Sequence, residues 1–374
     1  MEFYIKIRLI LLSFLLFLTT FVSINAQESN TYWQIDYAKG SIIEHSGVVG
    51  FLFKENPTLI SIGWHKKSEI DSEWKERYNF IDSGFVLNIQ NFHNKNLGNT
   101  YGLNYTTTHY LRNRNAKNQI NIQLGFGVGY NTNPLDFETN LTNIVMSSPI
   151  LYSQHIKINY TNNRIFKTMG FQSGISFTHY SNGGIIKPNL GLNSVFFNVG
   201  LNYHKSEPTI YTKLYESSKL AKQPIRFELG IGGGMHETLP GIGLKPIYYI
   251  SAKVSKRFNY KNGFQMGFDF FNSESIKDLA VYNAINDVKN LKNTPKDHKQ
   301  LAFSVGHELY FNKLSFASNI GYYLYRPFKD KTPLYENISF IRYFNNRKSS
   351  LRLNLKTHYF EAEHLTLGYH HQLF

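Results

Sequence analysis

The sequence contains no cysteine, and beyond its first residues it has no apolar run long enough for a transmembrane helix. Because no Cys follows the apolar run of residues 9–22, we do not expect a lipid-modified lipoprotein. Acidic residues are scarce as well, with 26 Asp and Glu against 40 Lys and Arg, for a formal net charge of +14. Such an excess fits soluble basic loops or a surface that meets anionic glycolipid. No basic helix and no recognised motif points to nucleic acid as a partner.

The first 26 residues are organised like a signal peptide. Lys6 and Arg8 form a basic start, residues 9–22 form a short apolar run, and Ala26 stands where cleavage is expected. The run is short for a membrane-spanning helix and ends in small and polar residues. We therefore expect residues 1–26 to be removed on export, and a mature chain without thiols fits the cell envelope.

Bulky apolar residues alternate with small or polar residues along much of the remaining chain. The alternation is clearest in residues 120–130, where Ile, Leu, Phe, Val and Tyr oppose Gly, Asn and Gln. The same period of two runs through residues 171–181 and 193–203. A period of two predicts β-strands. Bulky residues opposite a small polar face are typical of an outer-membrane barrel, with lipid outside and a wet lumen inside.

The fold class predicted from these runs is all-β, a transmembrane antiparallel β-barrel of the outer-membrane type with roughly 14–16 strands. One closed barrel over residues 27–374 is expected, because closure removes the strand edges that a membrane does not tolerate. Residues 204–222 are predicted as a polar link, and residues 273–299 as a surface loop with a helical turn. The chain ends in Phe374, as barrels read by the barrel assembly machinery usually do. These features predict the cell outer membrane as the location.

The hairpin of residues 171–203 carries the strongest chemical signal. By strand count it holds the seventh and eighth strands, so with a periplasmic N-terminus its turn lies outside the cell. His179, Ser181 and Asn193 fall on the bulky, lipid-facing side near the rim. Unpartnered polar groups are costly there, which favours a functional interpretation. A His-x-Ser pair alone has little weight, since it recurs by chance.

The surrounding residues add to that signal. The stretch that begins at His179 reads HYSNGG, and Pro188, Asn189 and Gly191 follow it. This pattern resembles the PagL-type lipid A 3-O-deacylases of the acyloxyacyl hydrolase family, outer-membrane barrels that hydrolyse an ester-linked acyl chain of lipid A. The closing segment, residues 356–374, resembles larger members of the family less specifically.

The resemblance implies roles for the hairpin residues. Ser181 would be the nucleophile, and His179 its general base. The Gly184 N–H and the Asn189 side chain would form the oxyanion hole, with Asn182 in the same substrate-binding turn.

The chain departs from the family pattern at Asn193, which stands where the family has a Glu that orients the histidine. A neutral amide can hold an imidazole tautomer, but it cannot stabilise the imidazolium as a carboxylate does. His236 and Glu237, after a Gly-rich strand, could supply the missing carboxylate, although polarity at a barrel rim is the simpler interpretation.

The implied function is that of a serine esterase acting on lipid A or lipopolysaccharide among outer-membrane lipids, most simply at the 3-position, without metal or cofactor. Two alternatives stay open: a non-catalytic barrel (a pore or a binding protein) that retains a degenerate motif, and a phospholipase. The compact enzymes of the family end near residues 193–203. An alternative architecture is therefore an eight-stranded barrel in residues 27–205 followed by a second β unit in residues 206–374.

Three further features have modest signals. Residues 133–149 are a candidate helix or lid, or equally a packed turn at a rim. Within them, Asp136 and Glu138 are weak candidates for a cation site, because no cluster with metal-ligand spacing surrounds them. His370 and His371 are adjacent, so on a strand they face opposite sides and do not share one metal.

Overall fold

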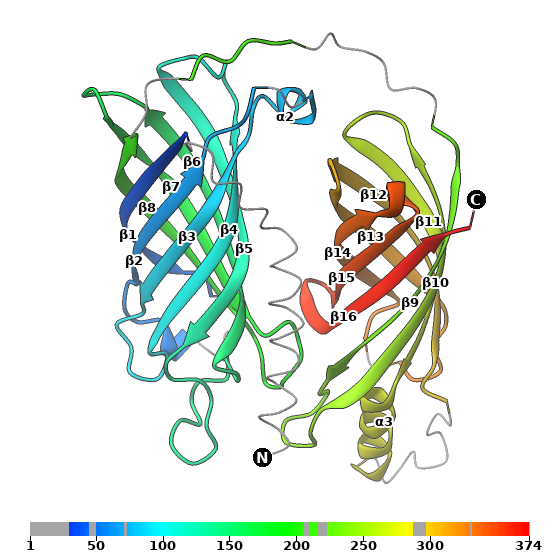
Figure 1. Cartoon of the computed structure of the whole chain (residues 1–374). Coiled ribbons are helices and arrows are strands. Elements are labelled where there is room, and N and C mark those ends of the chain that lie inside the picture. The colour runs from blue at the N-terminus through cyan, green and yellow to red at the C-terminus, as the bar shows by residue number, and fades with distance from the viewer. Residues whose placement is uncertain are drawn as a thin grey trace.

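A computed structural model describes residues 30–44, 50–70, 73–204, 209–214, 223–286, 297–329 and 331–373. The predicted signal peptide (residues 1–26) and Phe374 lie outside the described residues. Within the described part, the protein consists mainly of antiparallel strands in two groups (Figure 1).

The first group comprises β1 Thr31–Ile42, β2 Thr58–Lys66, β3 Asp82–Asn91, β4 Asn99–Tyr110, β5 Asn118–Asn131, β6 Ile150–Asn162, β7 Met169–Ser181 and β8 Leu192–His204. The second group comprises β9 Arg226–His236, β10 Lys245–Arg257, β11 Asn262–Ser273, β12 Gln300–Phe311, β13 Leu314–Tyr325, β14 Leu334–Phe344, β15 Ser349–His358 and β16 Glu361–Gln372. Short helices occupy the connections: η1 Gly50–Leu52, α2 Glu73–Arg77, α3 Glu274–Asn286 and η3 Asn345–Arg347. No helix in the described ranges is both long and apolar enough to cross a membrane.

Each group closes into its own barrel. Strand β8 returns to β1 with a register that runs from Tyr32 opposite His204 to Ile42 opposite Ser194, and β16 pairs with β9. The all-β antiparallel barrel predicted from the sequence is confirmed, but its strands form two closed eight-stranded barrels. The preference for one larger barrel was therefore wrong, and the alternative division near residue 205 is the observed one. Closing at β8 leaves no free edge in either barrel, so neither needs the other's strands.

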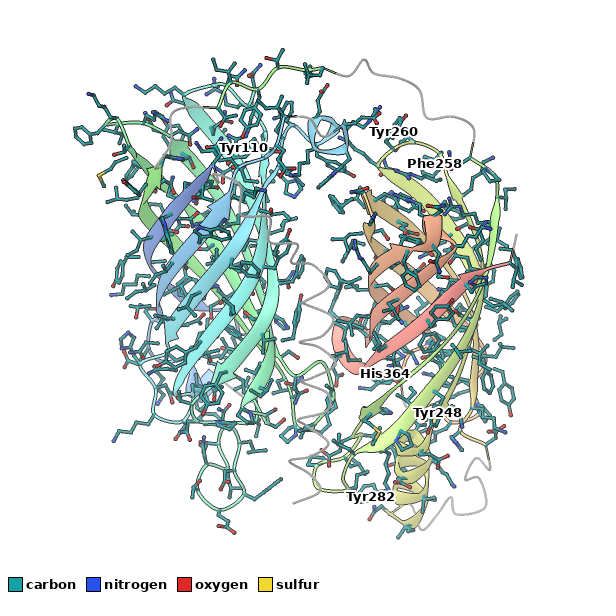
Figure 2. All side chains as sticks on the ribbon, viewed as in Figure 1. Tyr110, Tyr248, Phe258, Tyr260, Tyr282 and His364 are labelled. Carbon is teal, nitrogen blue, oxygen red and sulfur yellow. The ribbon has the colours of Figure 1, made fainter. Side chains whose placement is uncertain are left out.

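The alternating sequence pattern places apolar residues outside and polar residues inside. On β5 the residues facing the lumen are buried, while Ile120 and Tyr130 on the other face are exposed. On β7 and β8 the outer face likewise carries exposed Ile175 and Phe197. Side chains cover both faces of the barrel walls (Figure 2). The lipid-facing and lumen-facing assignments follow directly from the two-residue period.

Polar side chains fill the lumens. In the first barrel, Lys157 on β6 donates to Asp36 on β1 over 2.8 Å, and both are buried. These strands are not neighbours in the barrel, so the ion pair crosses the lumen. In the second barrel, buried Arg352 and Glu228 form an ion pair. An interior of eight strands is just wide enough for side chains to fill.

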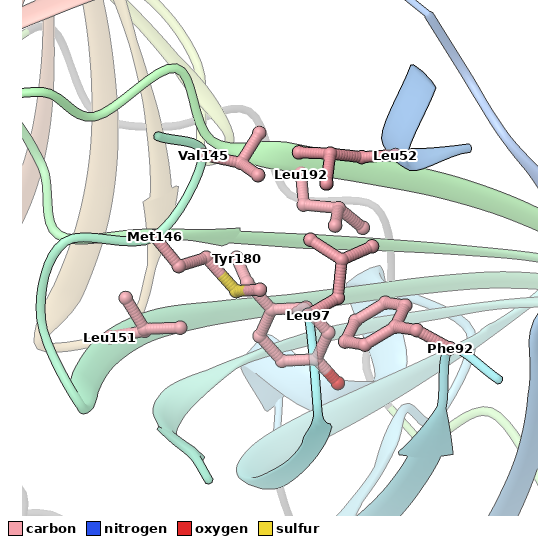
Figure 3. Close-up of a cluster of buried hydrophobic side chains, with 8 residues drawn as sticks. All are labelled: Leu52, Phe92, Leu97, Val145, Met146, Leu151, Tyr180 and Leu192. Carbon is pink, nitrogen blue, oxygen red and sulfur yellow. The ribbon is translucent and has the colours of Figure 1, made fainter. Parts of the chain in front are cut away.

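One end of the first lumen is closed by an apolar cluster, which we call the plug. Its buried members come from strands and loops: Leu52, Phe92, Leu97, Val145, Met146, Leu151, Tyr180 and Leu192 (Figure 3). Residues 133–149, predicted as a helix or lid or as a packed turn at a rim, contain no helix and supply Val145 and Met146 to the plug. The packed turn is the observed alternative.

The two barrels lie side by side (Figure 1). Midway along them, the rings of Phe126 and Phe340 meet edge to face, with centroids 4.7 Å apart. At the end that carries α2, the Tyr78 hydroxyl donates to the Tyr310 carbonyl, with 2.5 Å between the oxygens. At the opposite end, the loop after β7 contacts the second barrel. The candidate site lies at that loop.

Candidate active site

The hairpin of β7 and β8 brings the predicted histidine and its partner together. His179 and Asn193 are direct partners in the register of the two strands. Both are partly exposed and share the outer, lipid-facing side of the barrel. Directly opposed residues in an antiparallel pair have Cβ atoms about 5 Å apart, within reach of a side-chain hydrogen bond.

That hydrogen bond is present. His179 Nδ1 lies 2.7 Å from Asn193 Oδ1. An amide oxygen only accepts, so Nδ1 carries the proton and donates it. The other ring nitrogen, Nε2, is then left with its lone pair, which is the state that a general base requires. Asn193 thus fixes the tautomer of His179.

Ser181 is two residues beyond His179 and is 5% exposed. Its Oγ accepts hydrogen bonds from the Gly183 N–H (3.0 Å) and from the Asn189 side-chain amide (2.9 Å). The orientation of that amide is set by Asn182, whose backbone N–H donates to Asn189 Oδ1 over 3.2 Å. The turn therefore aims two donors at the hydroxyl, the kind of arrangement that can stabilise negative charge developing beside it.

Gly191 shows how closely histidine and serine approach each other. A Cβ built on Gly191 would lie 3.2 Å from His179 Cε1 and 3.6 Å from Ser181 Cβ. His179 Cε1, which lies between the two ring nitrogens, and Ser181 Cβ are therefore both close to the same position beside Gly191. Gly191 has φ +71°, and its N–H donates to the Val145 carbonyl over 3.0 Å.

Gly184 differs in part from the sequence-based assignment. Its N–H donates to Asn182 Oδ1 over 3.0 Å, within the turn, while the Gly183 N–H is the one at Ser181. The oxyanion role of Gly184 stays a prediction, and Gly183 is an additional candidate donor that the sequence analysis missed. Its signal was the Gly183-Gly184 pair, because both residues have positive φ and the sequence alone does not say which N–H points inward.

His236 and Glu237 do not supply a carboxylate to His179 in this geometry. His236 is buried in the second barrel, and its Nε2 lies 2.7 Å from Ser273 Oγ. The Glu237 carboxylate accepts from the backbone N–H groups of Lys187 and Gly243. Asn193 is therefore the side chain that orients His179.

The weaker candidates stay apart from this site. Asp136 accepts three hydrogen bonds from its own loop, and the backbone N–H groups among these donors lower the pKa of its carboxyl. His370 lies within 3.1 Å of the Tyr249 hydroxyl in the second lumen, whereas His371 contacts Ser349 over 3.0 Å. Across the described ranges, no three His, Asp or Glu side chains are grouped so that they could hold a metal ion.

Comparison with known families gives two matches, one on each barrel. Residues 58–202 match the lipid A 3-O-deacylase (PagL) model, and residues 225–373 match the C-terminal domain model of acyloxyacyl hydrolase. A comparison with curated proteins found no match.

Solved structures similar to this chain include engineered variants of the porin of Rhodopseudomonas blastica. One has 6% sequence identity, with 92% of this chain and 99% of the porin covered, at a TM-score of 0.19. A triple mutant of the same porin has the same identity and coverage at a TM-score of 0.18. Similarity at this level carries no argument about the fold or the function.

Each family match covers nearly all of one barrel. The first match spans β2 to β8 and includes the hairpin with His179, Ser181 and Asn193. The second match spans β9 to β16. The chain therefore belongs to the lipid A 3-O-deacylase (PagL) family of acyloxyacyl hydrolases.

Proposed function

We propose that this protein is an outer-membrane serine esterase that removes an ester-linked acyl chain, the one at the 3-position, from lipid A. The observation that carries the proposal is the 2.7 Å hydrogen bond from His179 to Asn193, on the same barrel face as Ser181. Membership of a lipid A deacylase family supports the substrate class.

The chemistry follows from the positions of these groups. Ser181 Oγ attacks the ester carbonyl carbon as His179 Nε2 takes the hydroxyl proton. The carbonyl oxygen becomes an oxyanion, for which the Asn189 amide and the glycine N–H groups of the turn are the available donors. When the ester C–O bond breaks, His179 returns the proton to the sugar alkoxide, and the acyl chain stays on Ser181.

A water molecule completes the cycle. It loses a proton to His179 Nε2 and attacks the acyl-serine carbonyl, and Ser181 leaves with the proton returned to it, so that a free fatty acid is released. No residue in this scheme needs a metal or a cofactor. Because histidine and serine lie on the lipid-facing side, the acyl chain can stay in the bilayer while its ester reaches them. The membrane then orients the substrate beforehand.

The location follows from the same proposal. A cleaved signal peptide in residues 1–26 would export the chain, and the barrel assembly machinery would insert it in the outer membrane. The turn with Ser181 would then face outward, in the leaflet that holds lipopolysaccharide. Lumens filled with side chains weigh against the alternative of a pore.

The test is mass spectrometry of lipid A from outer membranes that contain the wild-type protein or Ser181→Ala. The wild type should remove one 3-linked hydroxyacyl mass, and Ser181→Ala should leave lipid A intact. Ser173→Ala is a matched control, because its hydroxyl lies on the same strand but donates to the Asn198 carbonyl. Heat-modifiability on gels checks that all barrels are folded.

Intact lipid A with a folded wild-type barrel would contradict the proposal, and so would release that persists in Ser181→Ala. Release of fatty acid from glycerophospholipid alone would make the protein a phospholipase. Asn193→Glu restores the carboxylate of the family pattern. It is expected to raise kcat, because a carboxylate stabilises the imidazolium that forms in each step.

A further inference from the structure

The second barrel contacts the turn of the candidate site directly. The loop of residues 182–191 follows β7 in the first barrel, and Glu237 is the first residue after β9 in the second. The Glu237 backbone N–H donates to the Ile185 carbonyl over 2.9 Å. Its carboxylate Oε2 accepts the Lys187 backbone N–H over 3.0 Å. One residue of the second barrel therefore binds the backbone of the 182–191 loop at two points.

Glu237 is itself held in place. Its second carboxylate oxygen, Oε1, accepts the Gly243 N–H over 2.9 Å, and the residue is 5% exposed. Gly243 has φ +85°, a conformation that favours glycine. Hydrogen bonds from backbone N–H groups to a carboxylate are charge-assisted and are roughly twice as strong as neutral ones. One carboxylate oxygen is thus held by the β9–β10 connection, which orients the other oxygen toward the Lys187 N–H.

A second contact lies beneath Gly184. A Cβ on this residue would lie 2.6 Å from the Glu363 carbonyl oxygen and 2.8 Å from that of Ala362, both on β16. Gly184 has φ +79°, so it lies in the left-handed region while packed against the backbone of the second barrel. A larger residue at this position requires the loop or the backbone of β16 to shift.

The Lys187 side chain makes a third contact. Its Nζ lies 3.5 Å from Glu361 Oε1 and 3.4 Å from the Ala362 carbonyl. Burial lowers the pKa of Lys187, against the opposing attraction of Glu361. The 182–191 loop is therefore held from two sides, by the β9–β10 connection and by the start of β16.

We propose that the second barrel is a clamp for the 182–191 loop and that Glu237 is a positioning residue of the active site. This inference rests on the proposed esterase function. The loop contains Gly183, Gly184 and Gly191, all with positive φ, so its free conformational entropy is large. Yet it must hold the Asn189 amide and the Gly183 N–H within hydrogen-bonding distance of Ser181. Misplacement by about 1 Å far from the chemistry can cost about 100-fold in rate.

The mechanism of the clamp is therefore indirect. Glu237 does not touch the reacting atoms, but it fixes Ile185 and Lys187, which lie between the two donors of the turn. Without the carboxylate, the loop keeps its internal hydrogen bonds, for example from Asn182 Nδ2 to the Ile186 carbonyl over 2.8 Å. The Lys187 backbone N–H, however, loses its acceptor on the second barrel, which weakens the attachment of the loop. The donors then spend less time at Ser181, while the lipid-facing surface that binds acyl chains is unchanged.

The experiment compares Glu237→Ala, Glu237→Gln and Thr238→Ala with the wild type in the full-length protein. Thr238 is the matched control, because its hydroxyl bonds to Ser275 on the second barrel and not to the loop. In steady-state deacylation of lipid A, Glu237→Ala should lower kcat by about tenfold to 100-fold with KM within about twofold. Glu237→Gln keeps only one acceptor oxygen and should give an intermediate kcat, and Thr238→Ala should match the wild type.

Hydrogen exchange of the Lys187 backbone amide reports on the clamp without any substrate. It should speed up by about tenfold or more in Glu237→Ala and stay unchanged in Thr238→Ala. An unchanged Lys187 amide, or an unchanged kcat in an active protein, would overturn the clamp. If the wild type does not deacylate lipid A, the proposed function fails, and the exchange measurement alone decides the clamp. If Glu237→Ala does not fold, the same criteria apply to Glu237→Gln.

Discussion

The hydrogen bond between His179 and Asn193 separates two tasks that a carboxylate performs together. Through Oδ1 at 2.7 Å, Asn193 holds the tautomer in which Nδ1 carries the proton and Nε2 is the basic nitrogen. It carries no charge, so the imidazolium formed during the proposed reaction gains no ion pair from it. Asn193 therefore orients the His179 ring as a carboxylate would, but it stabilises the imidazolium less.

A substitution at Gly191 tests how closely His179 and Ser181 lie to each other. Gly191→Ala places a methyl group 3.2 Å from His179 Cε1, at φ +71°. We expect deacylation to fall by about tenfold or more, because the imidazole must move away from Ser181. The left-handed backbone adds a strain of about 1–2 kcal/mol. Lipid A deacylation kinetics of the purified variant check this expectation.

Gly241→Ala is the control for Gly191→Ala, because it introduces backbone strain without a new side-chain contact. Gly241 has a similar φ of +83°, but a Cβ there meets nothing within 4 Å. It should cost comparable strain and leave kcat unchanged. Equal kcat values for the two variants would contradict the juxtaposition at Gly191.

At the level of elements, the plug supports the hairpin from inside the first lumen. Tyr180 lies between His179 and Ser181 in sequence, but its side chain points inward and is fully buried among the apolar side chains of the plug (Figure 3). The residues on either side of it face outward on the same strand. Because Tyr180 is packed in the plug, the end of β7 that carries His179 and Ser181 has little freedom to twist or to shift along the barrel axis.

Met146 tests this support, since it is fully buried in the plug from the loop before β6. Met146→Ala should destabilise the first barrel by about 2–5 kcal/mol, because it leaves a cavity. Leu141→Ala, in the same loop, is the control: Leu141 is 62% exposed, and its loss should change stability by under about 0.5 kcal/mol. Urea unfolding in detergent micelles measures both. Equal midpoints for the two variants would show that the plug does not stabilise the barrel.

The two-residue period in the sequence was enough to predict the strands, but it was not enough to predict which strands pair to close a barrel. Residues 120–130 gave a strand with the correct outer face, and the register then placed His179 opposite Asn193 as expected. The pairing of β8 with β1 has no local signal, because closure depends on stagger and on what fills the lumen. For the same reason, the contacts of Glu237 with Ile185 and Lys187 could not be predicted, since they join segments of two separately closed sheets.

At the scale of the whole molecule, two filled barrels differ from one wide barrel in what can pass through them. A single barrel of 16 strands would leave an aqueous channel, whereas eight strands leave room for little more than side chains. In the first barrel, the ion pair of Asp36 and Lys157 crosses the lumen, and the plug covers one end. A cavity of about 270 Å³ remains near Arg114 at the other end. In the second barrel, Lys356 and Glu363 lie 3.3 Å apart in the interior.

We therefore expect the purified protein to produce no stepwise ion conductance in planar lipid bilayers, beside a general porin as the positive control. The physical reason is that an ion would have to displace buried, paired charges and the apolar plug, both of which resist rearrangement. Reproducible conductance steps from the wild type would contradict filled lumens and would favour the pore. Absence of conductance, together with loss of deacylation in Ser181→Ala but not in the control Ser173→Ala, would place the function on the outer surface of the first barrel, where the second barrel meets it.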